Sequence, residues 1–120
     1  MPRLQSDAVD VFMAVANNEQ PTTEWSKEAT LGIVLASKGY PGSYDKGFAI
    51  RGTERVDAKI FHMGTARKDG ELVTAGGRVM IVVASAPSLE EALKKARKEI
   101  ANIECDNLFH RTDIGAKAFR

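Results

Sequence analysis

The sequence has a single cysteine, few aromatic residues and almost no net charge. Cys105 cannot form a disulfide within the chain, and its isolation fits a reducing compartment, so we expect a cytoplasmic protein. No apolar run reaches the roughly 18 residues that a membrane-spanning helix needs, so no membrane partner is expected. A formal net charge of +1 gives no electrostatic reason to expect nucleic acid as a partner. These absences leave a globular chain of one-domain size, 120 residues.

Motifs of a self-sufficient active site are also missing. His62 and His110 lack the paired spacing of zinc ligands, and we interpret both as structural or surface residues. Cys105 has no assigned histidine partner and is expected to be inert. No glycine-rich segment has the G-x-x-x-x-G-K-[ST] or G-x-G-x-x-G form of a nucleotide site. The sequence therefore predicts no catalytic residue and no metal ligand in this chain.

Hydrophobic periodicity predicts an α+β domain with mostly antiparallel strands. Asp69-Gly70 suits a type I′ hairpin turn, and Ser88 with Glu91 forms a capping box at a helix start. The apolar run at 29–37 is typical of a strand covered on both faces. Helices are expected over 7–17, from Ser88 onward and from Asp113 towards Phe119, with strands over 29–37, 56–62 and 78–86 and a linker over 18–28.

The first two predicted helices each have an apolar face. Ser6 is the expected cap of the first helix. The second carries two pairs of opposite charge at i,i+4 spacing, Glu90 with Lys94 and Glu91 with Lys95. The apolar positions are Val9, Phe12, Met13 and Ala16 in the first helix and Leu89, Leu93, Ala96, Ile100 and Ile103 in the second.

Two loops carry the residues best suited to a ligand. Both tyrosines lie in GYPGSYDKG, residues 39–47, where glycine lets backbone amides approach a ligand closely. Two shorter glycine-rich segments, Gly64-Thr65 and Gly76-Gly77-Arg78, have the same property. For each segment an ordinary turn between strands is the alternative. Further on, Arg111 stands beside the expected helix start at Asp113, which favours anion binding, with a capped helix and an exposed arginine as the alternative. The residues alone thus indicate an α+β domain that could contact a phosphate.

Four ordered blocks resemble the C-terminal part of the phosphoribosylamine-glycine ligase family. That family joins glycine to 5-phosphoribosylamine with hydrolysis of ATP to ADP and phosphate, using magnesium or manganese, in de novo purine synthesis. An acyl phosphate of glycine forms, and the amine attacks it. The blocks are GYPGSYDKG at 39–47, FHMGT at 61–65, DGELVTAGGRVMIVVA at 69–84 and FHRTDIGAKA at 109–118, and PRLQSD at 2–7 also resembles the family.

The resemblance implies a division of the chain and a fold. Residues 1–20 would be the trailing helix of an ATP-grasp domain, and 21–120 the C-terminal domain. That domain is expected to be an antiparallel sheet or partial barrel with packed helices, like the C-terminal domain of biotin carboxylase. The ATP and metal ligands would lie before Pro2, in ATP-grasp and N-terminal domains that are the expected partners. The isolated chain is therefore expected to hold no cofactor and to be inactive.

The resemblance also implies a set of substrate-binding residues. Thr112 stands where the family commonly has a second arginine, so a phosphate clamp of two arginines is incomplete here. Two other functions stay open, a free-standing sugar-phosphate-binding module and a module that self-associates through an apolar surface. The residues implied to meet phosphoribosylamine, or the domain junction, are Gly39, Tyr40, Pro41, Gly42, Arg111, Asp113 and Gly115.

Overall fold

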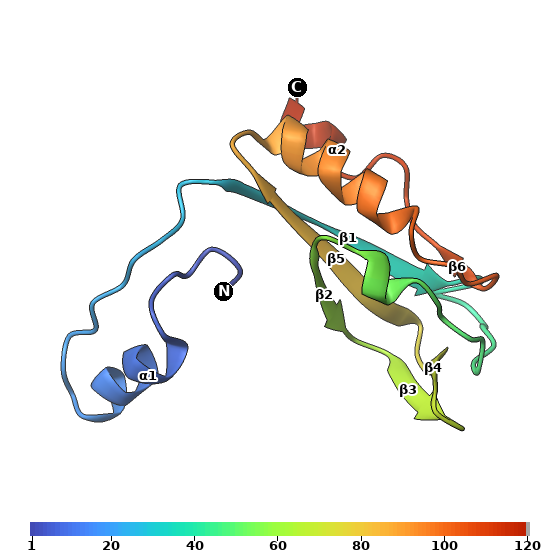
Figure 1. Cartoon of the computed structure of the whole chain (residues 1–120), viewed down its shortest axis with the longest axis horizontal. Helices are drawn as coiled ribbons and strands as arrows, with labels where there is room; N and C mark the ends of the chain where they lie inside the picture. Colours follow the sequence, from blue (N-terminus) through green and yellow to red (C-terminus); the bar gives the residue numbers. More distant parts are fainter. Residues whose placement is uncertain (120) are drawn as a thin grey trace.

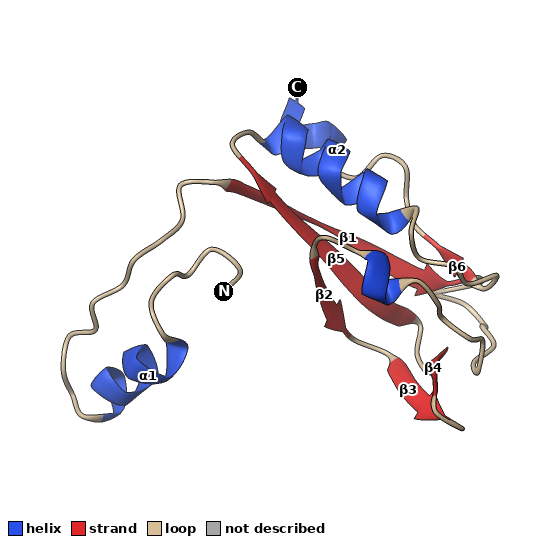
Figure 2. Ribbon diagram, in the orientation of Figure 1, coloured by secondary structure: helices blue, strands red, loops and turns tan. Residues whose placement is uncertain are grey.

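The computed structural model describes residues 1–119 and shows an antiparallel sheet with one helix packed on it (Figures 1 and 2). The main sheet has the strand order β2-β5-β1-β6, and a separate hairpin pairs β3 with β4. All of these pairs are antiparallel, which confirms the predicted α+β class. The elements are α1 (Ala8–Ala16), β1 (Ala29–Ser37), β2 (Lys59–His62), β3 (Thr65–Lys68), β4 (Glu71–Thr74), β5 (Arg78–Ala86), α2 (Leu89–Ile100) and β6 (Leu108–Phe109), with 3-10 turns at Thr53–Arg55 and Ala116–Phe119.

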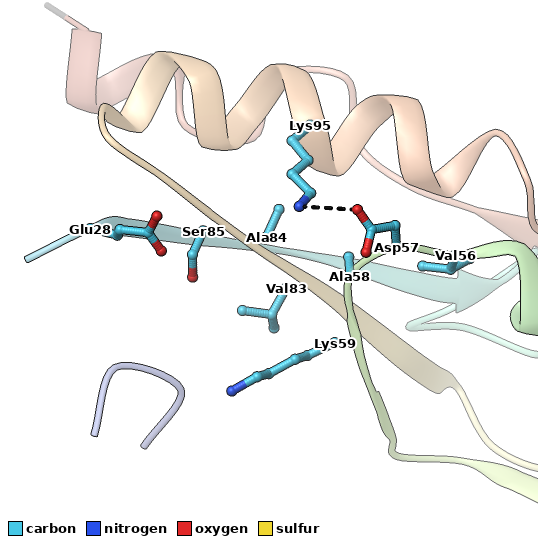
Figure 3. Close-up of a pocket in the computed structure, with 9 residues that line it drawn as sticks. All are labelled: Glu28, Val56, Asp57, Ala58, Lys59, Val83, Ala84, Ser85 and Lys95. Carbon is cyan, nitrogen blue, oxygen red and sulfur yellow. Dashed lines mark ion pairs between the residues drawn. The ribbon is translucent and has the colours of Figure 1, made fainter. Parts of the chain in front are cut away.

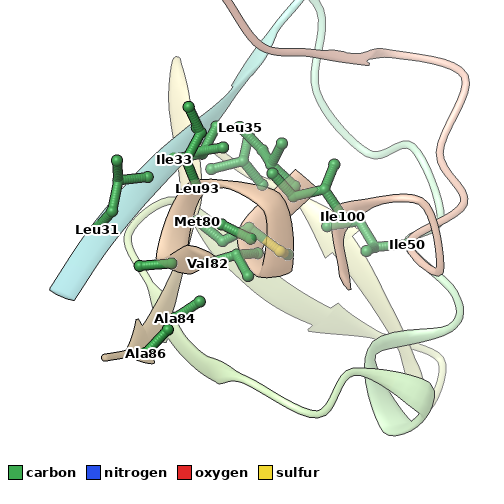
Figure 4. Packing of buried hydrophobic residues seen from close by; sticks show 13 residues of the cluster. Leu31, Ile33, Leu35, Ile50, Met80, Val82, Ala84, Ala86, Leu93 and Ile100 are labelled. Carbon is green, nitrogen blue, oxygen red and sulfur yellow. The ribbon is translucent and has the colours of Figure 1, made fainter. Parts of the chain in front are cut away.

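The core lies between α2 and one face of the two long strands (Figure 4). Ile33 of β1 pairs with Val82 of β5, and alternate residues on each strand point to the helix. Ile33 is 1% exposed and Val82 fully buried, because α2 lies over both strands. The buried apolar residues of this cluster are Leu31, Ile33, Leu35, Ile50, Val79, Met80, Val82, Ala84, Ala86, Ala92, Leu93, Ala96 and Ile100.

Several local predictions are confirmed. Strands β1 and β5 have the predicted bounds. Asp69 and Gly70 connect β3 to β4 with φ of 52° and 84°, the left-handed angles that the turn requires. The Ser88 hydroxyl accepts a hydrogen bond from the Glu91 amide at 3.2 Å and so caps α2. Lys94 pairs with Glu90 at 3.0 Å, one turn earlier on the same helix.

Contacts around α2 explain two incorrect predictions. The strand expected over 56–62 begins only at Lys59, because the backbone amide of Asp57 turns away to the buried carboxylate of Glu99, at 2.7 Å. The ion pair expected between Glu91 and Lys95 is replaced, since the Lys95 ammonium lies 3.5 Å from the Asp57 carboxylate. A side chain from another segment thus outcompetes the local partner on the helix.

Further corrections concern the C-terminal segment and the burial of the two faces of β1. Helix α2 covers only one face of β1, so Val34 on the opposite face is partly exposed instead of fully covered. The helix expected from Asp113 begins only at Ala116, after a turn over 112–115. Strand β6 was not expected, since two residues are too few to show a period.

The N-terminal segment lies apart from the sheet (Figure 1). Asp7, not Ser6, caps α1, because its carboxylate accepts the Val9 amide at 2.7 Å while the Ser6 hydroxyl accepts the Glu24 amide. No residue of α1 is buried, and Phe12 on its apolar face is 62% exposed. The radius of gyration is 16.8 Å, above the roughly 14 Å of a compact chain of this length. Among residues 1–119, neither helix has the length and apolarity to span a bilayer.

Candidate functional site

A β-bulge determines which side chains of β5 stand opposite the end of β1. Leu35 pairs with Met80 but the next residue, Ala36, pairs with Arg78, so Val79 is an extra residue on β5. Bulges change the direction of side chains and often occur beside active sites. Ala36 also pairs with Phe109 of β6. Because directly paired residues share a face of a sheet, Arg78, Ala36 and Phe109 form one row across three strands.

This row borders a hollow of about 390 Å³. The small side chain of Ala36 lies between two large ones, which leaves room above the sheet. The lining is mainly apolar, with two guanidinium groups and one imidazole. The hollow brings the 39–47 loop together with the 109–118 block, two segments far apart in the sequence. The lining residues are Val34, Ala36, Tyr40, Pro41, Arg78, Phe109, His110, Arg111 and Ile114.

The 39–47 loop is held in place by glycine geometry and by β4. Gly39 has φ of 95°, and a Cβ added there would overlap the carbonyl oxygen of Ser43. At the other end of the loop, the Gly47 amide donates to the carbonyl of Thr74 at 2.7 Å. Gly42 lies inside the turn, where an added Cβ would be 3.2 Å from the Gly39 carbonyl oxygen. Gly39 and Gly42 therefore shape the loop and do not line the hollow.

Tyr40 is positioned by close packing on a backbone. Its ring lies against Gly77, where an added Cβ would be 2.7 Å from the ring atom Cε2. The Gly77 carbonyl in turn accepts the Ser37 amide at 2.8 Å, next to the start of the loop. The ring of Tyr44 meets that of Tyr40 edge to face, with centroids 6.2 Å apart. One edge of the hollow is thus the ring of Tyr40, whose position is restrained by Gly77 and Tyr44.

The side chain of Arg111 is paired with Asp113. Its Nε and a terminal nitrogen donate to the two carboxylate oxygens at 2.8 and 2.6 Å. These hydrogen bonds raise the pKa of Arg111 and lower the pKa of Asp113, with the attraction of opposite charges acting in the same direction. Gly115, with φ of 82°, packs near Leu31 and Leu93 and is absent from the lining of the hollow.

The pKa of Asp113 gives a direct test of this pair. We expect the carboxyl carbon of Asp113 to titrate by NMR below the roughly 3.9 of a free aspartate. Because the folded-state pKa is lowered, the pair stabilises the fold above the unfolded-state pKa, and its contribution is lost as pH falls through the folded-state pKa. In Arg111→Met the midpoint should rise, because the hydrogen bonds and the charge that lower it are removed. An unchanged midpoint would show that another group sets it.

Two residues of the hollow were not assigned a role by sequence. Arg78 ends the glycine-rich segment Gly76-Gly77-Arg78, which was interpreted either as a close approach to a ligand or as an ordinary turn, and no feature of the sequence indicates the bulge that directs its side chain. His110, predicted to be structural or at the surface, is half-buried and lies in the lining. Its Nδ1 is 3.2 Å from the Arg111 carbonyl oxygen. His62 is exposed, with Nδ1 3.0 Å from the Thr65 hydroxyl, away from the hollow.

A second hollow, of about 410 Å³, lies at the other edge of the sheet (Figure 3). Lys59 and Lys95 reach into it, but the charge of Lys95 is offset by Asp57, and Glu28 adds a further carboxylate. It contains none of the residues that the sequence implied to bind a substrate. The first hollow is therefore the better candidate site.

The residues present do not fit a metal ion. Within 1–119, no three His, Cys, Asp or Glu side chains are grouped as a cation would require. The glycine loop also departs from the forms that hold nucleotide phosphates. What the hollow offers is guanidinium donors, an aromatic edge and apolar walls, which suits a small polar molecule with an anionic group.

Comparison with known proteins identifies the family. Residues 30–117 match the family described as phosphoribosylglycinamide synthetase, C domain. Phosphoribosylamine-glycine ligases of Halalkalibacterium halodurans and Vibrio parahaemolyticus are 48% and 42% identical, each over 98% of this chain. The crystal structure of the Thermotoga maritima phosphoribosylamine-glycine ligase superposes with a TM-score of 0.78 at 32% identity, covering 88% of this chain and 27% of that one. The chain spans only 28% and 29% of the two curated relatives. With most of its length matched, the chain belongs to the phosphoribosylglycinamide synthetase C-domain family.

Proposed function

We propose that this chain is the acceptor-side domain of a phosphoribosylamine-glycine ligase. The reaction joins 5-phosphoribosylamine to glycine and converts ATP to ADP and phosphate. The supporting observation is the hollow in which the 39–47 loop meets the 109–118 block. Phosphoribosylamine carries a phosphate and a polar sugar, which match the guanidinium groups and the tyrosine edge of this hollow. The chain would bind and orient this acceptor for attack on activated glycine.

The roles of the implied site residues follow from their positions. Tyr40 and Pro41 would contact the sugar, since both line the hollow. Gly39 and Gly42 would keep the loop in its shape, and Gly115 would let the last segment pack closely against the core. Arg111 would form a wall of the hollow in the orientation that Asp113 imposes.

ATP and magnesium or manganese would be bound by other domains of the same enzyme. Activation of glycine as an acyl phosphate would take place there, and the isolated chain would be inactive. The ATP-grasp and N-terminal domains would then be the partners of this chain in the cytoplasm. We place the boundary after residue 20, with α1 as the end of the ATP-grasp domain. The absence of any buried residue in α1 supports this boundary. The domain would share its architecture, including a partial barrel, with the C-terminal domain of biotin carboxylase.

A chimeric enzyme tests the proposal. This chain replaces the matching segment of the Halalkalibacterium halodurans ligase, to which it is 48% identical. We expect ADP formation that requires both phosphoribosylamine and glycine, within about tenfold of the parent enzyme. The same ligase without this segment should be inactive. A chimera that folds like the parent, by circular dichroism and gel filtration, but forms no product would contradict the proposed function.

Self-association is a second candidate function, favoured by the apolar side chains that α1 exposes. Val9 and Phe12 are 66% and 62% exposed, and a second copy could cover them. Sedimentation of the chain over a range of concentrations should show dimers if this is its role. A monomer at every concentration would exclude it.

A further inference from the structure

Arg78 differs from the other arginines in the part of the chain that the structure describes. Its guanidinium donates no hydrogen bond to any acceptor within residues 1–119, although it is exposed at the start of β5 and lines the candidate hollow. Each of the others donates to a carboxylate or a backbone carbonyl, and these are Arg3, Arg51, Arg55, Arg67, Arg97 and Arg111.

The other cation of the hollow is already occupied. Arg111 uses two donors on the carboxylate of Asp113, at 2.8 and 2.6 Å. A phosphate bound at this same edge of the guanidinium would have to displace that carboxylate, and the carboxylate also neutralises the charge that would attract a phosphate to the remaining N–H groups. The negative charge of Asp113 would also repel a second anion beside Arg111. Arg78 has no such competitor among residues 1–119.

The backbone around Arg78 is firmly placed. The bulge at Val79 brings Arg78 opposite Ala36, and the carbonyl of Val79 accepts the amides of Met63 and Gly64, each at 2.9 Å. On its other side, Gly77 packs against the ring of Tyr40. A cation attached to a fixed backbone loses less entropy when it binds a ligand.

The surroundings strengthen the attraction of Arg78 for an anion. Most of the lining is apolar, including Val34, Pro41, Phe109 and Ile114. Such walls lower the local dielectric and so strengthen an ion pair relative to bulk solvent. A sugar phosphate could bind with its phosphate on Arg78 and its sugar against the edge of Tyr40.

We propose that Arg78 binds the phosphate group of a pentose phosphate in this hollow, while Arg111 stays paired with Asp113. The choice of a pentose phosphate rests on the proposed function. The recognition chemistry itself, a guanidinium binding a phosphate monoester, does not depend on ligase activity. Inorganic phosphate shares that chemistry, and the experiment separates the two.

Binding to the full chain is measured first. Ribose 5-phosphate, inorganic phosphate and ribose are titrated separately, and the Nε–Hε NMR signals of the arginines report which guanidinium is engaged. Ribose 5-phosphate should shift the Arg78 signal saturably and at least threefold more tightly than inorganic phosphate, and ribose should leave it unchanged. Equal affinity for the two phosphates would overturn the pentose assignment. A shift at Arg111 without one at Arg78 would overturn the residue assignment.

Variants of the same chain give the matched comparison. Arg78→Met should weaken binding of ribose 5-phosphate at least tenfold, and Arg78→Lys should retain part of the affinity. The double variant Arg111→Met, Asp113→Asn removes the whole ion pair without leaving a lone carboxylate, and it should change the affinity less than threefold. Arg67→Met removes the same charge from the distant β3–β4 hairpin and should have no effect. Wild-type affinity in Arg78→Met would refute the proposal, as would an equal loss in the double variant.

The ligase chimera provides the second measurement. There, Arg78→Met should raise KM for phosphoribosylamine at least tenfold and leave KM for ATP within twofold. An unchanged KM for phosphoribosylamine overturns the role of Arg78, whatever the isolated chain binds. Failure of the proposed function can be told apart from failure of the Arg78 proposal, because the chimera would then be inactive even with Arg78 intact. No binding by the chain together with an inactive chimera would overturn both.

Discussion

Replacing Ile33 with alanine should lower the free energy of unfolding by about 2 to 5 kcal/mol, the usual loss for a large aliphatic residue in a core. Ile33 is 1% exposed and lies where β1, β5 and α2 meet. Its neighbours come from three elements, so the cavity left by the missing atoms cannot close without moving a strand or the helix. Urea unfolding followed by circular dichroism measures the change.

Two further substitutions make this prediction specific. Ile33→Val removes a single methylene and should cost about 0.5 to 1.5 kcal/mol. Val9→Ala removes apolar atoms from α1, but Val9 is 66% exposed, so the free energy of unfolding should change by less than about 0.5 kcal/mol. Equal losses at Ile33 and Val9 would mean that α1 is packed as tightly as the core, against the structure.

The second large effect is expected at Gly39. Gly39→Ala should destabilise the chain more than Gly47→Ala, although both glycines lie in one loop with similar φ of 95° and 89°. An added Cβ meets the carbonyl oxygen of Ser43 at position 39 and nothing within 4 Å at position 47. The backbone strain is therefore shared, about 1 to 2 kcal/mol, and the overlap at Gly39 should add about 1 to 3 kcal/mol.

The same pair of variants tests the link between the loop and the site. Thermal unfolding gives the difference in stability, and the position of the Tyr40 ring is followed by its NMR signals. Gly39→Ala should shift the Tyr40 signals, because Tyr40 is the next residue and its ring packs on Gly77. Gly47→Ala should leave them in place. Equal destabilisation by the two variants would mean that the overlap with Ser43 is relieved at no cost.

Local patterns predicted much of the fold, because they act over a few residues. The turn at Asp69-Gly70 needs only two left-handed angles, and the cap of α2 needs only Ser88 and the amide of Glu91. Strands β1 and β5 were found at their predicted bounds since both are long and apolar. These features depend on local sequence and not on the structure of distant segments.

Contacts between distant segments account for what could not be predicted. Glu99 binds the amide of Asp57 and shortens β2, although 42 positions separate the two residues. The hollow depends in the same way on the pairing of Ala36 with both Arg78 and Phe109. The family resemblance assigned a binding role to the 39–47 loop and Arg111. It included Arg78 in the 69–84 block but gave it no role, and a one-residue bulge leaves no periodic signal that could have placed its side chain.

The extra residue at Val79 also couples distant parts of the molecule. Its carbonyl accepts two amides from the connection between β2 and β3, and the neighbouring residue is Arg78. The start of the β3–β4 hairpin and the strand position that borders the hollow are therefore held by one carbonyl group and its neighbouring residue. A substitution that removes the bulge would displace both the hairpin and the backbone of Arg78.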